Sequence, residues 1–369
     1  MKSGQTGQND LAMDSAGAVR RGEGLNLIAL KAFLRDELGI FGEIEVLQFP
    51  KGHSNLTYLL KTEAGRQVVL RRPPVGANIP SGHDMGREFR ILSTLHPHWP
   101  KVPRPLAYCA DKHVLGAPFY LMERVEGVIL RTPQHPGLAL DEKYMGRACT
   151  TLVSTLVEIH GLDLQEIGMT NFGRPDGYIQ RQVDGSTKRY HKAKTHEVPE
   201  VEEMARWLAE NQPESGKPAV IHNDYKYDNL VLDCDDPDVA KAVLDWEMCT
   251  VADPLMDLGT TLAYWVDPED PAPMHTLPFG PTVLPGNLRR EALVDAYVQR
   301  SGRAVDDPVF YYVYGLFKVA GIAQQIYGRF HHGVTTDPRF AKMIDAVRMM
   351  GRQGRAAILA DRISCIGAI

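Results

Sequence analysis

The residues best suited to chemistry gather in the stretch IHNDYKYDN, residues 221–229 of this 369-residue chain. Asp224 and Asn229 lie five positions apart, and Asp245 follows at the end of the short apolar run AVLD. A buried carboxylate destabilises a fold unless a cation or hydrogen-bond donors compensate it. One carboxylate to accept a hydroxyl proton, with an amide and a second carboxylate to bind Mg²⁺, would suit phosphoryl transfer from a metal nucleotide.

The elements that must position these residues change in type along the chain. Helical spacing predicts helices in NLIALKAFLRDELG and GREFRILSTL. Short runs of Val, Leu, Ile, Thr and Tyr predict an antiparallel meander with a further strand after it: IEVLQF, LTYLLKT, QVVLRR and FYLMERV. From about residue 140 onward helical patterns dominate, and two short strands, AVIHND and KAVLDW, carry the polar motif residues.

This order of elements predicts an α+β fold with two lobes, since 369 residues exceed the usual size of one core. Residues 24–122 would form a small nucleotide-binding lobe with an antiparallel sheet, and residues 123–369 a larger, mainly helical lobe for catalysis and substrate binding. Residues 1–23, rich in Gly, Ser, Asn and Gln, are predicted to be a flexible tail. Because small ligands usually bind in clefts, we expect the site at the seam of the lobes. The Pro-rich stretch 267–286 is predicted to be a lid or part of the substrate pocket.

Composition narrows the class of partner. The formal net charge of -5 leaves no basic footprint for nucleic acid. Five scattered cysteines with no CxxC pair predict neither a disulfide framework nor a zinc ribbon. The N-terminus lacks the apolar core of a signal peptide, and no run approaches the roughly 18 apolar residues of a membrane span. We therefore expect a cytoplasmic protein with a small-molecule partner, no nucleic acid and no membrane; its oligomeric state stays open.

Several stretches together resemble one family, the aminoglycoside phosphotransferase and choline kinase-like superfamily, whose fold is similar to that of protein kinases. They occur in family order across residues 50–260: KGHSNLTYLL, VVLRRPP, GREFRILSTL, FYLMERVEG, IHNDYKYDNLVLD and VLDWEMCTVADPLMDLG. Within the superfamily the chain looks most similar to bacterial phosphotransferases related to the kinase-like domain of some acyl-CoA dehydrogenase family proteins. The resemblance implies a bilobal protein-kinase-like fold that uses ATP and Mg²⁺ to phosphorylate a small-molecule hydroxyl.

The resemblance also implies roles for the motif residues. Asp224 would be the catalytic base, while Asn229 and Asp245 would bind Mg²⁺; the interval from Asp224 to Asn229 equals that in the kinase pattern HRDxxxxN. His222 is expected to brace the catalytic loop rather than act as a base. Glu247 is equally suited to a second metal ion and to an ordinary structural hydrogen bond. In DPLMDLG, Asp257 is expected to anchor the catalytic loop by accepting backbone N–H bonds, and Asp253 to be a turn residue.

An upstream cation and acid would complete the nucleotide site. By resemblance, Arg71 would hold the α and β phosphates and Glu88 would orient it, with Arg72 as the neighbouring candidate. Strand alternation lets only one of the two arginines face the site. Arginine replaces the lysine of the kinase pattern VAIK, yet it stays charged and forks two donors toward phosphate, so activity is not excluded.

Backbone and loop positions would hold the rest of the nucleotide. Ser54 and Asn55, in the loop GHSN, could donate hydrogen bonds to the β-phosphate. At FYLMERVEG the carbonyl of Glu123 and the amide of Val125 would pair with the adenine edge. Any residue type supplies such backbone groups, so this assignment rests on position alone.

Alternatives remain at this stage. The arginine at 71 and the glycine-poor loop would also fit a pseudokinase that binds a nucleotide or a partner without transfer, although the complete polar set counts against it. A protein Ser or Thr acceptor is disfavoured, because only seven residues separate Glu247 from Leu255 and leave no room for an APE-type activation segment. Among small molecules, a cationic aminoglycoside and a hydroxylated acyl thioester both stay open, as does the choice between ATP and GTP.

Overall fold

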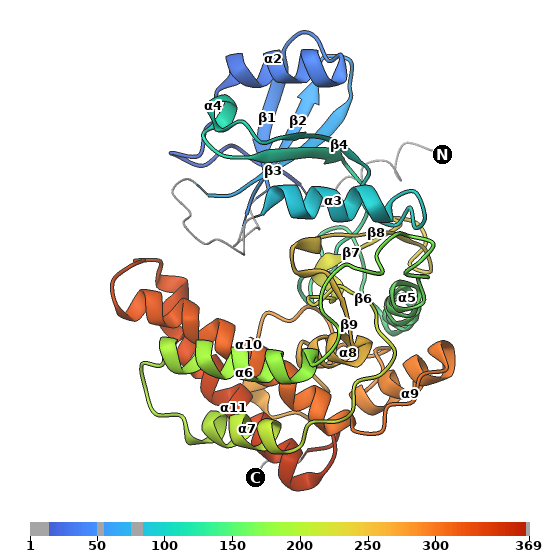
Figure 1. The fold of residues 1–369 in the computed structure, drawn as a ribbon, viewed down its shortest axis with the longest axis vertical. Coiled ribbons are helices and arrows are strands. Elements are labelled where there is room, and N and C mark those ends of the chain that lie inside the picture. Colours follow the sequence, from blue (N-terminus) through green and yellow to red (C-terminus); the bar gives the residue numbers. More distant parts are fainter. Residues whose placement is uncertain (1–14, 50–54, 75–83, 367–369) are drawn as a thin grey trace. The chain divides into compact units, whose positions relative to one another are not determined.

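The computed structural model describes residues 15–49, 55–74 and 84–366. The chain forms two compact units (Figure 1). The first takes in the chain up to Ile129 together with Asn229–Cys249, and the second takes in Leu130–Asp228 and Thr250–Ile369. Sequence order alone assigns Asn229–Cys249 to the C-terminal lobe, whereas in the structure this segment belongs with the N-terminal sheet.

The first unit is built on a five-stranded antiparallel sheet of order β1-β2-β3-β5-β4. Its strands are β1 (Ile44–Gln48), β2 (Leu56–Thr62), β3 (Gln67–Arg72), β4 (Pro105–Cys109) and β5 (Phe119–Glu123). The predicted meander β1–β2–β3 and the strand β5 are confirmed. Strand β4 was not predicted, because PLAYC begins with proline and its register against β5 shifts near Pro105, which hides any alternation.

Helices α2 (Leu27–Leu38) and α3 (Met85–Leu95) lie on opposite faces of this sheet, and the short α4 (Lys112–Leu115) lies beside α2 (Figure 1). Leu30 and Leu34 of α2 share a buried core with Val68 and Leu70 of β3. Successive side chains of a strand point to opposite faces. Arg71 therefore points away from α2, toward the face that α3 covers.

Residues 15–23 fall within the predicted tail, yet they are attached to the edge strand β1. Gly17 and Gln48 exchange two backbone hydrogen bonds of 2.9 and 2.8 Å. The Gln48 side chain donates to Glu23 at 2.5 Å, and the Tyr58 hydroxyl donates to the Glu23 carbonyl at 2.7 Å. Backbone pairing with a sheet edge needs no apolar side chains, so composition did not reveal it. The rest of the predicted tail lies outside the described residues.

The segment Asn229–Cys249 of the first unit forms a small hairpin. Its strands are β7 (Leu230–Leu232) and β8 (Ala240–Val243), and the 3₁₀ turn η2 (Trp246–Met248) follows them. Val231 and Ala242 pack against Ile129 in a small apolar cluster. In the connecting turn, Asp233 accepts hydrogen bonds from the backbone amides of Asp235 and Asp236. The hairpin thereby holds Asn229 and Asp245 at its two ends.

The second unit is mainly helical. It contains α5 (Glu142–His160), α6 (Tyr178–Ala193), α7 (Pro199–Glu210), α8 (Pro254–Ala263), α9 (Arg290–Ser301), α10 (Pro308–His331) and α11 (Met343–Ala360), with the strand pair β6 (Ala219–Ile221) and β9 (Thr250–Ala252). The short 3₁₀ segments are η1 (Tyr227–Asn229), which reaches the first residue of the hairpin segment, η3 (Ala272–Thr276) and η4 (Pro338–Lys342). Helix α10 packs against α6, α7, α8 and α11. Its aromatic run FYYVYGLF is buried in the core of the unit.

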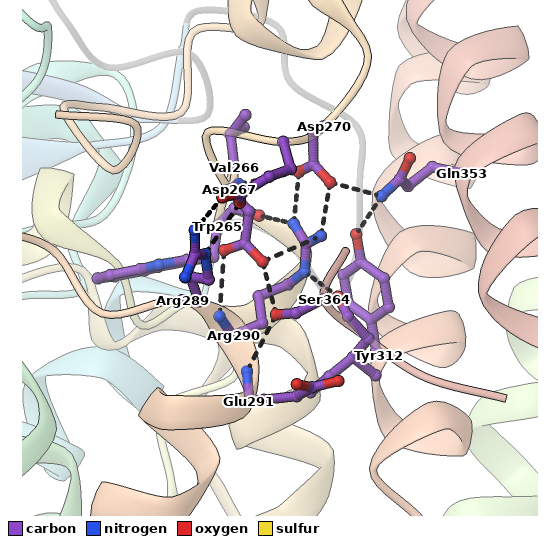
Figure 2. Close-up of polar contacts among 12 residues, drawn as sticks. Trp265, Val266, Asp267, Asp270, Arg289, Arg290, Glu291, Tyr312, Gln353 and Ser364 are labelled. Atoms are coloured by element: carbon purple, nitrogen blue, oxygen red, sulfur yellow. Dashed lines mark hydrogen bonds and ion pairs between the residues drawn. The ribbon is translucent and has the colours of Figure 1, made fainter. Parts of the chain in front are cut away.

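The Pro-rich stretch 267–286 is anchored at its start by a buried charge cluster (Figure 2). Arg290 has no exposed surface and donates to both oxygens of Asp270 at 2.5 and 2.6 Å. Asp267 accepts from the Arg290 amide at 3.1 Å and from the Ser364 hydroxyl at 2.6 Å, and Gln353 donates to Asp270 at 3.0 Å (Figure 2). The cluster thus ties this stretch to α9, α11 and the segment after α11.

Within the described ranges, no helix combines the length and the apolar character that a membrane span needs.

Candidate active site

The loop that carries Asp224 follows β6 and is held by α8. Asp257, which has no exposed surface, accepts the backbone amide of His222 at 2.6 Å and that of Asn223 at 2.7 Å. The Asp224 amide in turn donates to His222 Nδ1 at 3.2 Å. The predictions that Asp257 anchors the loop and that His222 braces it are confirmed. Asp253, predicted to be a turn residue, is the N-cap of α8.

Asp257 is kept ionised by its surroundings. Burial alone would raise the pKa of Asp257, but the hydrogen bond from His160 and the charges of His160 and His222 hold it below the ordinary value. His160 Nε2 lies 3.3 Å from Asp257 Oδ2, and its Nδ1 lies 2.9 Å from the hydroxyl of Tyr297. A charged acceptor forms stronger hydrogen bonds than a neutral one, so the two loop amides are firmly fixed.

Asn223 has an unusual backbone conformation directly before Asp224. Its φ of 66° lies in the left-handed region, which costs most L-residues about 1–2 kcal/mol, although asparagine tolerates it better. Its side chain pairs with the Tyr178 hydroxyl at 3.1 Å. Such conformations are found preferentially at functional sites. Asp245, in the first unit, has a similar φ of 67°.

Asp224 has a cationic neighbour that the sequence analysis did not single out. Lys226 Nζ lies 2.6 Å from Asp224 Oδ2, and about a fifth of each side chain is exposed. The ammonium also lies 4.4 Å from the ring centre of Tyr264, which is an attractive cation–π distance. Burial would lower the pKa of Lys226, but Tyr264 and Asp224 hold it above the ordinary value. Lys226 lies two residues after Asp224 in the motif. This proximity in sequence is the feature from which its contact with Asp224 could have been predicted.

In the first unit, Arg71 gathers three carboxylates around one guanidinium group. Its Nε lies 3.2 Å from Glu88, while its Nη2 lies 2.5 Å from Asp245 and 3.0 Å from Glu247. Arg72 instead donates to the carbonyl of Pro73. Arg71 therefore contacts Glu88 as predicted and Arg72 does not, while the role of Arg71 in binding the phosphates stays a prediction.

Negative charge exceeds positive charge in this cluster. Burial, together with the charge of Asp245, raises the pKa values of Glu88 and Glu247 to about 7, although Arg71 opposes the shift. A bound divalent cation would relieve this excess. Within the described residues no group of three or more His, Cys, Asp and Glu side chains is arranged for a metal ion. Such an arrangement is not required for Mg²⁺, which usually takes only one or two carboxylates and relies on phosphate and water oxygens.

Asn229 and Asp245 are brought together by the hairpin. The Asn229 carbonyl accepts the amide of Leu244, the residue before Asp245, at 2.8 Å. Arg87 of α3 donates to the carbonyls of Glu247 and Cys249 and so fixes the turn after Asp245. The two side chains proposed for Mg²⁺ thus share the first unit with Arg71, whereas Asp224 belongs to the second unit.

The remaining nucleotide positions are placed in part. Asn55 is buried and donates its amide to Glu247 at 2.8 Å, while Ser54 lies outside the described residues. Glu123 ends β5, and its amide donates to the carbonyl of Arg104 at 2.9 Å. The Val125 side chain packs against the apolar cluster of Ile129. Pairing of Glu123 and Val125 with adenine stays a prediction.

Comparison with known proteins now identifies the family. The family model described as "Phosphotransferase enzyme family" matches residues 45–293 of the chain. The chain belongs to this family. The phosphotransferase is 35% identical over 323 residues to "Acyl-CoA dehydrogenase family member 10" of Mus musculus, a match that covers 86% of this chain and 30% of that protein. The chain therefore spans about a third of this curated relative.

Solved structures agree with this membership. A Ralstonia eutropha protein provisionally assigned to the aminoglycoside phosphotransferases superposes on this phosphotransferase with a TM-score of 0.74 at 28% identity, over 90% of this chain and 98% of the other. An aminoglycoside phosphotransferase in complex with AMP-PNP and hygromycin B gives a TM-score of 0.54 at 17% identity, over 87% of this chain and 98% of the other. The second likeness concerns the fold alone. The predicted family and α+β, protein-kinase-like fold, with an antiparallel sheet followed by a mainly helical region, are confirmed.

Proposed function

We propose that this phosphotransferase is an ATP- and Mg²⁺-dependent kinase of a small-molecule hydroxyl. The observation that carries the proposal is the cluster of Arg71 with Glu88, Asp245 and Glu247, because one guanidinium group faces three carboxylates. Buried charge of one sign is unfavourable unless a counter-charge joins it. A magnesium ion bound with its nucleotide would add positive charge beside Asp245 and would bring phosphate oxygens within reach of Arg71.

The residues then divide the work of phosphoryl transfer. Asp224 orients the acceptor hydroxyl and takes its proton, with a carboxylate that is partly exposed and therefore accessible. Asn229 and Asp245 are oxygen donors suited to Mg²⁺, which when bound would neutralise phosphate charge. Arg71, oriented by Glu88, binds the α and β phosphates, and Asn55 lies beside Glu247 in the same cluster. Lys226, next to Asp224, adds a positive charge where the transferred phosphoryl group would become more negative.

For the acceptor we favour a hydroxylated acyl compound over an aminoglycoside. The curated relative carries "acyl-CoA dehydrogenase" in its name, and this chain matches a portion of it. Lys226 is ion-paired with Asp224 and so takes up the negative charge that would otherwise attract a polycationic aminoglycoside. The structurally similar enzyme solved with hygromycin B shares only 17% identity, so its acceptor does not transfer to this chain.

The test is the Asp224→Asn variant. Release of ADP from ATP and Mg²⁺ is measured with a panel of hydroxylated acyl compounds and aminoglycosides, and the Kd of Mg²⁺–ADP is measured by calorimetry. Loss of a general base lowers rates by about 10²–10⁴-fold, so we expect at least a 100-fold loss of turnover with nearly unchanged nucleotide affinity. Asp238→Asn, in the exposed hairpin turn, is the matched control and should keep full turnover.

Two outcomes would contradict the proposal. Unchanged turnover in Asp224→Asn would remove this residue as the base. Tight nucleotide binding without ADP release for any compound of the panel would indicate a nucleotide-binding module instead of a kinase.

A further inference from the structure

A buried lysine of α10 contacts the loop that carries the proposed base. Lys318 is 8% exposed, and its Nζ donates to the carbonyl of Asn223 at 2.6 Å and to the Thr260 hydroxyl at 3.3 Å. Asn223 immediately precedes Asp224 and has the left-handed φ of 66°. The lysine thus holds the carbonyl of a residue in a conformation that costs energy to maintain.

This contact fixes the peptide unit from which Asp224 extends. The carbonyl of the Asn223–Asp224 peptide is held by Lys318, and its N–H is held by His222 Nδ1 at 3.2 Å. One peptide earlier, the Asn223 amide is held by Asp257. A peptide group is planar, so holding both its oxygen and its hydrogen sets the orientation of the plane. The plane in turn fixes the N–Cα bond of Asp224, from which its side chain extends.

Stability alone does not account for a lysine at this position. Its neighbours on α10 include Tyr314, Phe317 and Ala320, which are apolar or aromatic and buried. Taking an ammonium group out of water is costly, and apolar replacements of buried charges are often neutral or stabilising. A charged side chain that is retained in such surroundings calls for a role other than packing.

We propose that Lys318 is a positioning residue for Asp224, holding the Asn223 carbonyl so that the base keeps its direction toward the acceptor hydroxyl. The inference rests on the proposed function, in which Asp224 is the base. Lys318 itself contacts the loop backbone and Thr260, and it acts on the reaction through the loop.

The electrostatic surroundings keep Lys318 charged at neutral pH. Burial lowers the pKa of Lys318 to about 8, while the charges of Asp224 and Asp257 oppose the shift and those of Lys226 and Arg189 add to it. These four groups come from the catalytic loop, α8 and α6. Lys318 therefore loses its charge as the pH rises through about 8, and a charge-assisted hydrogen bond becomes a weaker neutral one.

The experiment compares Lys318→Met with Gln324→Met. Both changes remove a buried donor to a backbone carbonyl from α10, but Gln324 donates to Ala193 at 2.9 Å and not to the catalytic loop. Hydrogen–deuterium exchange of the peptide covering residues 221–225 reports the hold on the loop without any activity. Release of ADP from ATP and Mg²⁺, with water and with the panel compounds as acceptors, reports the effect on catalysis.

We expect Lys318→Met to speed exchange of this peptide by about tenfold, because a hydrogen bond to a charged group is lost. Its kcat should fall by about 10- to 100-fold with the KM for ATP changed less than threefold, since a small misplacement of a catalytic group has effects of this size. Added to Asp224→Asn, the change should slow turnover no further. Gln324→Met should alter neither the exchange of residues 221–225 nor kcat, and Lys318→Arg, which keeps a cationic donor, should recover part of the rate.

The outcomes separate this inference from the proposed function. If Asp224→Asn abolishes turnover while Lys318→Met leaves both exchange and kcat unchanged, the inference on Lys318 is overturned and the proposed function stands. If Asp224→Asn leaves turnover unchanged, the proposed function fails, and with it the positioning role. If Lys318→Met does not fold, hydrogen–deuterium exchange of the wild-type protein tests the inference instead. The protection of residues 221–225, corrected for intrinsic rates, should fall severalfold from pH 7 to 9.5. Constant protection over this range would overturn the inference.

Discussion

Replacing Asp257 by asparagine should destabilise the protein strongly, because this side chain anchors the catalytic loop. The carboxylate accepts three hydrogen bonds, from the amides of His222 and Asn223 and from His160, and it has no exposed surface. An asparagine keeps a single acceptor oxygen and turns an NH₂ group toward a donor. At least one buried N–H then loses its partner at a cost of about 1–3 kcal/mol, and the bonds that remain lose their charge assistance.

These terms together give a loss of about 3–5 kcal/mol in the free energy of unfolding, the range usual for removing one partner of a buried ion pair. In domains of 150–250 residues each kcal/mol lowers Tm by about 2–4 °C, so Tm should fall by about 10 °C. Thermal and urea unfolding of the wild type and of Asp257→Asn at pH 7 measure this difference.

The effect should depend on pH in a defined direction. The pKa of Asp257 is lower in the folded protein than its ordinary value of 3.8, so its stabilisation is complete above that value and is lost as the pH falls through the lower folded value. The gap between wild type and variant should therefore be full at pH 7 and narrow below about pH 3.8. His160 and His222 contribute to the shift, so the narrowing tests the charge and not merely the hydrogen bonds.

Asp253→Asn is the matched control, because it removes the same charge four residues earlier at the start of the same helix. Asp253 caps α8 through the Leu255 amide at 2.8 Å and also accepts the partly buried amide of Gly216. Asparagine caps helices about as well as aspartate. The expected cost of about 1 kcal/mol is that of weakening the hydrogen bond from the Gly216 amide. A loss below 1 kcal/mol for Asp257→Asn at pH 7, or a gap that stays constant down to pH 3, would refute the reasoning.

Two further substitutions test the other charged clusters, each against the adjacent arginine. Arg71→Met should weaken the affinity for Mg²⁺–ADP by about 10- to 100-fold in calorimetry, because one to two strong charged hydrogen bonds are lost. Arg72→Met should change this affinity less than threefold. Equal effects of the two substitutions would contradict the placement of Arg71 at the phosphates. Arg290→Met leaves Asp267 and Asp270 buried without their cation and should cost about 3–5 kcal/mol in urea unfolding. Arg289→Met, which loses only a surface pair with Glu269, should cost less than about 1 kcal/mol, and a similar loss in both variants would contradict the assigned burial.

Long or strongly patterned elements were predictable from sequence, and short or polar ones were not. The strands β1 to β3 and the helices α5, α9 and α10 have enough apolar residues at regular spacing to predict them. Helix α6 was not singled out, because its sequence YIQRQVDGSTKRYHKA is mostly polar, with few apolar positions to mark a buried face. Strands β7 and β9 were not predicted, because three residues are too few for a period to emerge. Strand β6 is equally short and was predicted from the apolar run directly before the polar motif.

The same division holds for the candidate site. Asp257 could be predicted as a loop anchor from its motif, and strand alternation reduced the upstream cation to one of two arginines. Only the contact of Arg71 with Glu88 decided between them. The link from Lys318 to Asn223 joins residues 95 positions apart, and in sequence that lysine is one polar residue in an aromatic helix. Contacts of this kind depend on how helices pack, which local pattern does not encode.

The return of Asn229–Cys249 to the N-terminal sheet has a consequence for synthesis on the ribosome. The strands β1 to β5 emerge early. Val231 and Ala242, which cover Ile129, emerge only after all of α5, α6 and α7 has been translated, and so does Asp245, which pairs with Arg71. At usual elongation rates this delay is roughly ten seconds. During that interval Ile129 lacks its apolar cover, and Arg71 keeps Glu88 but lacks Asp245 and Glu247. The growing chain should therefore be most open to chaperones and to proteolysis at this stage.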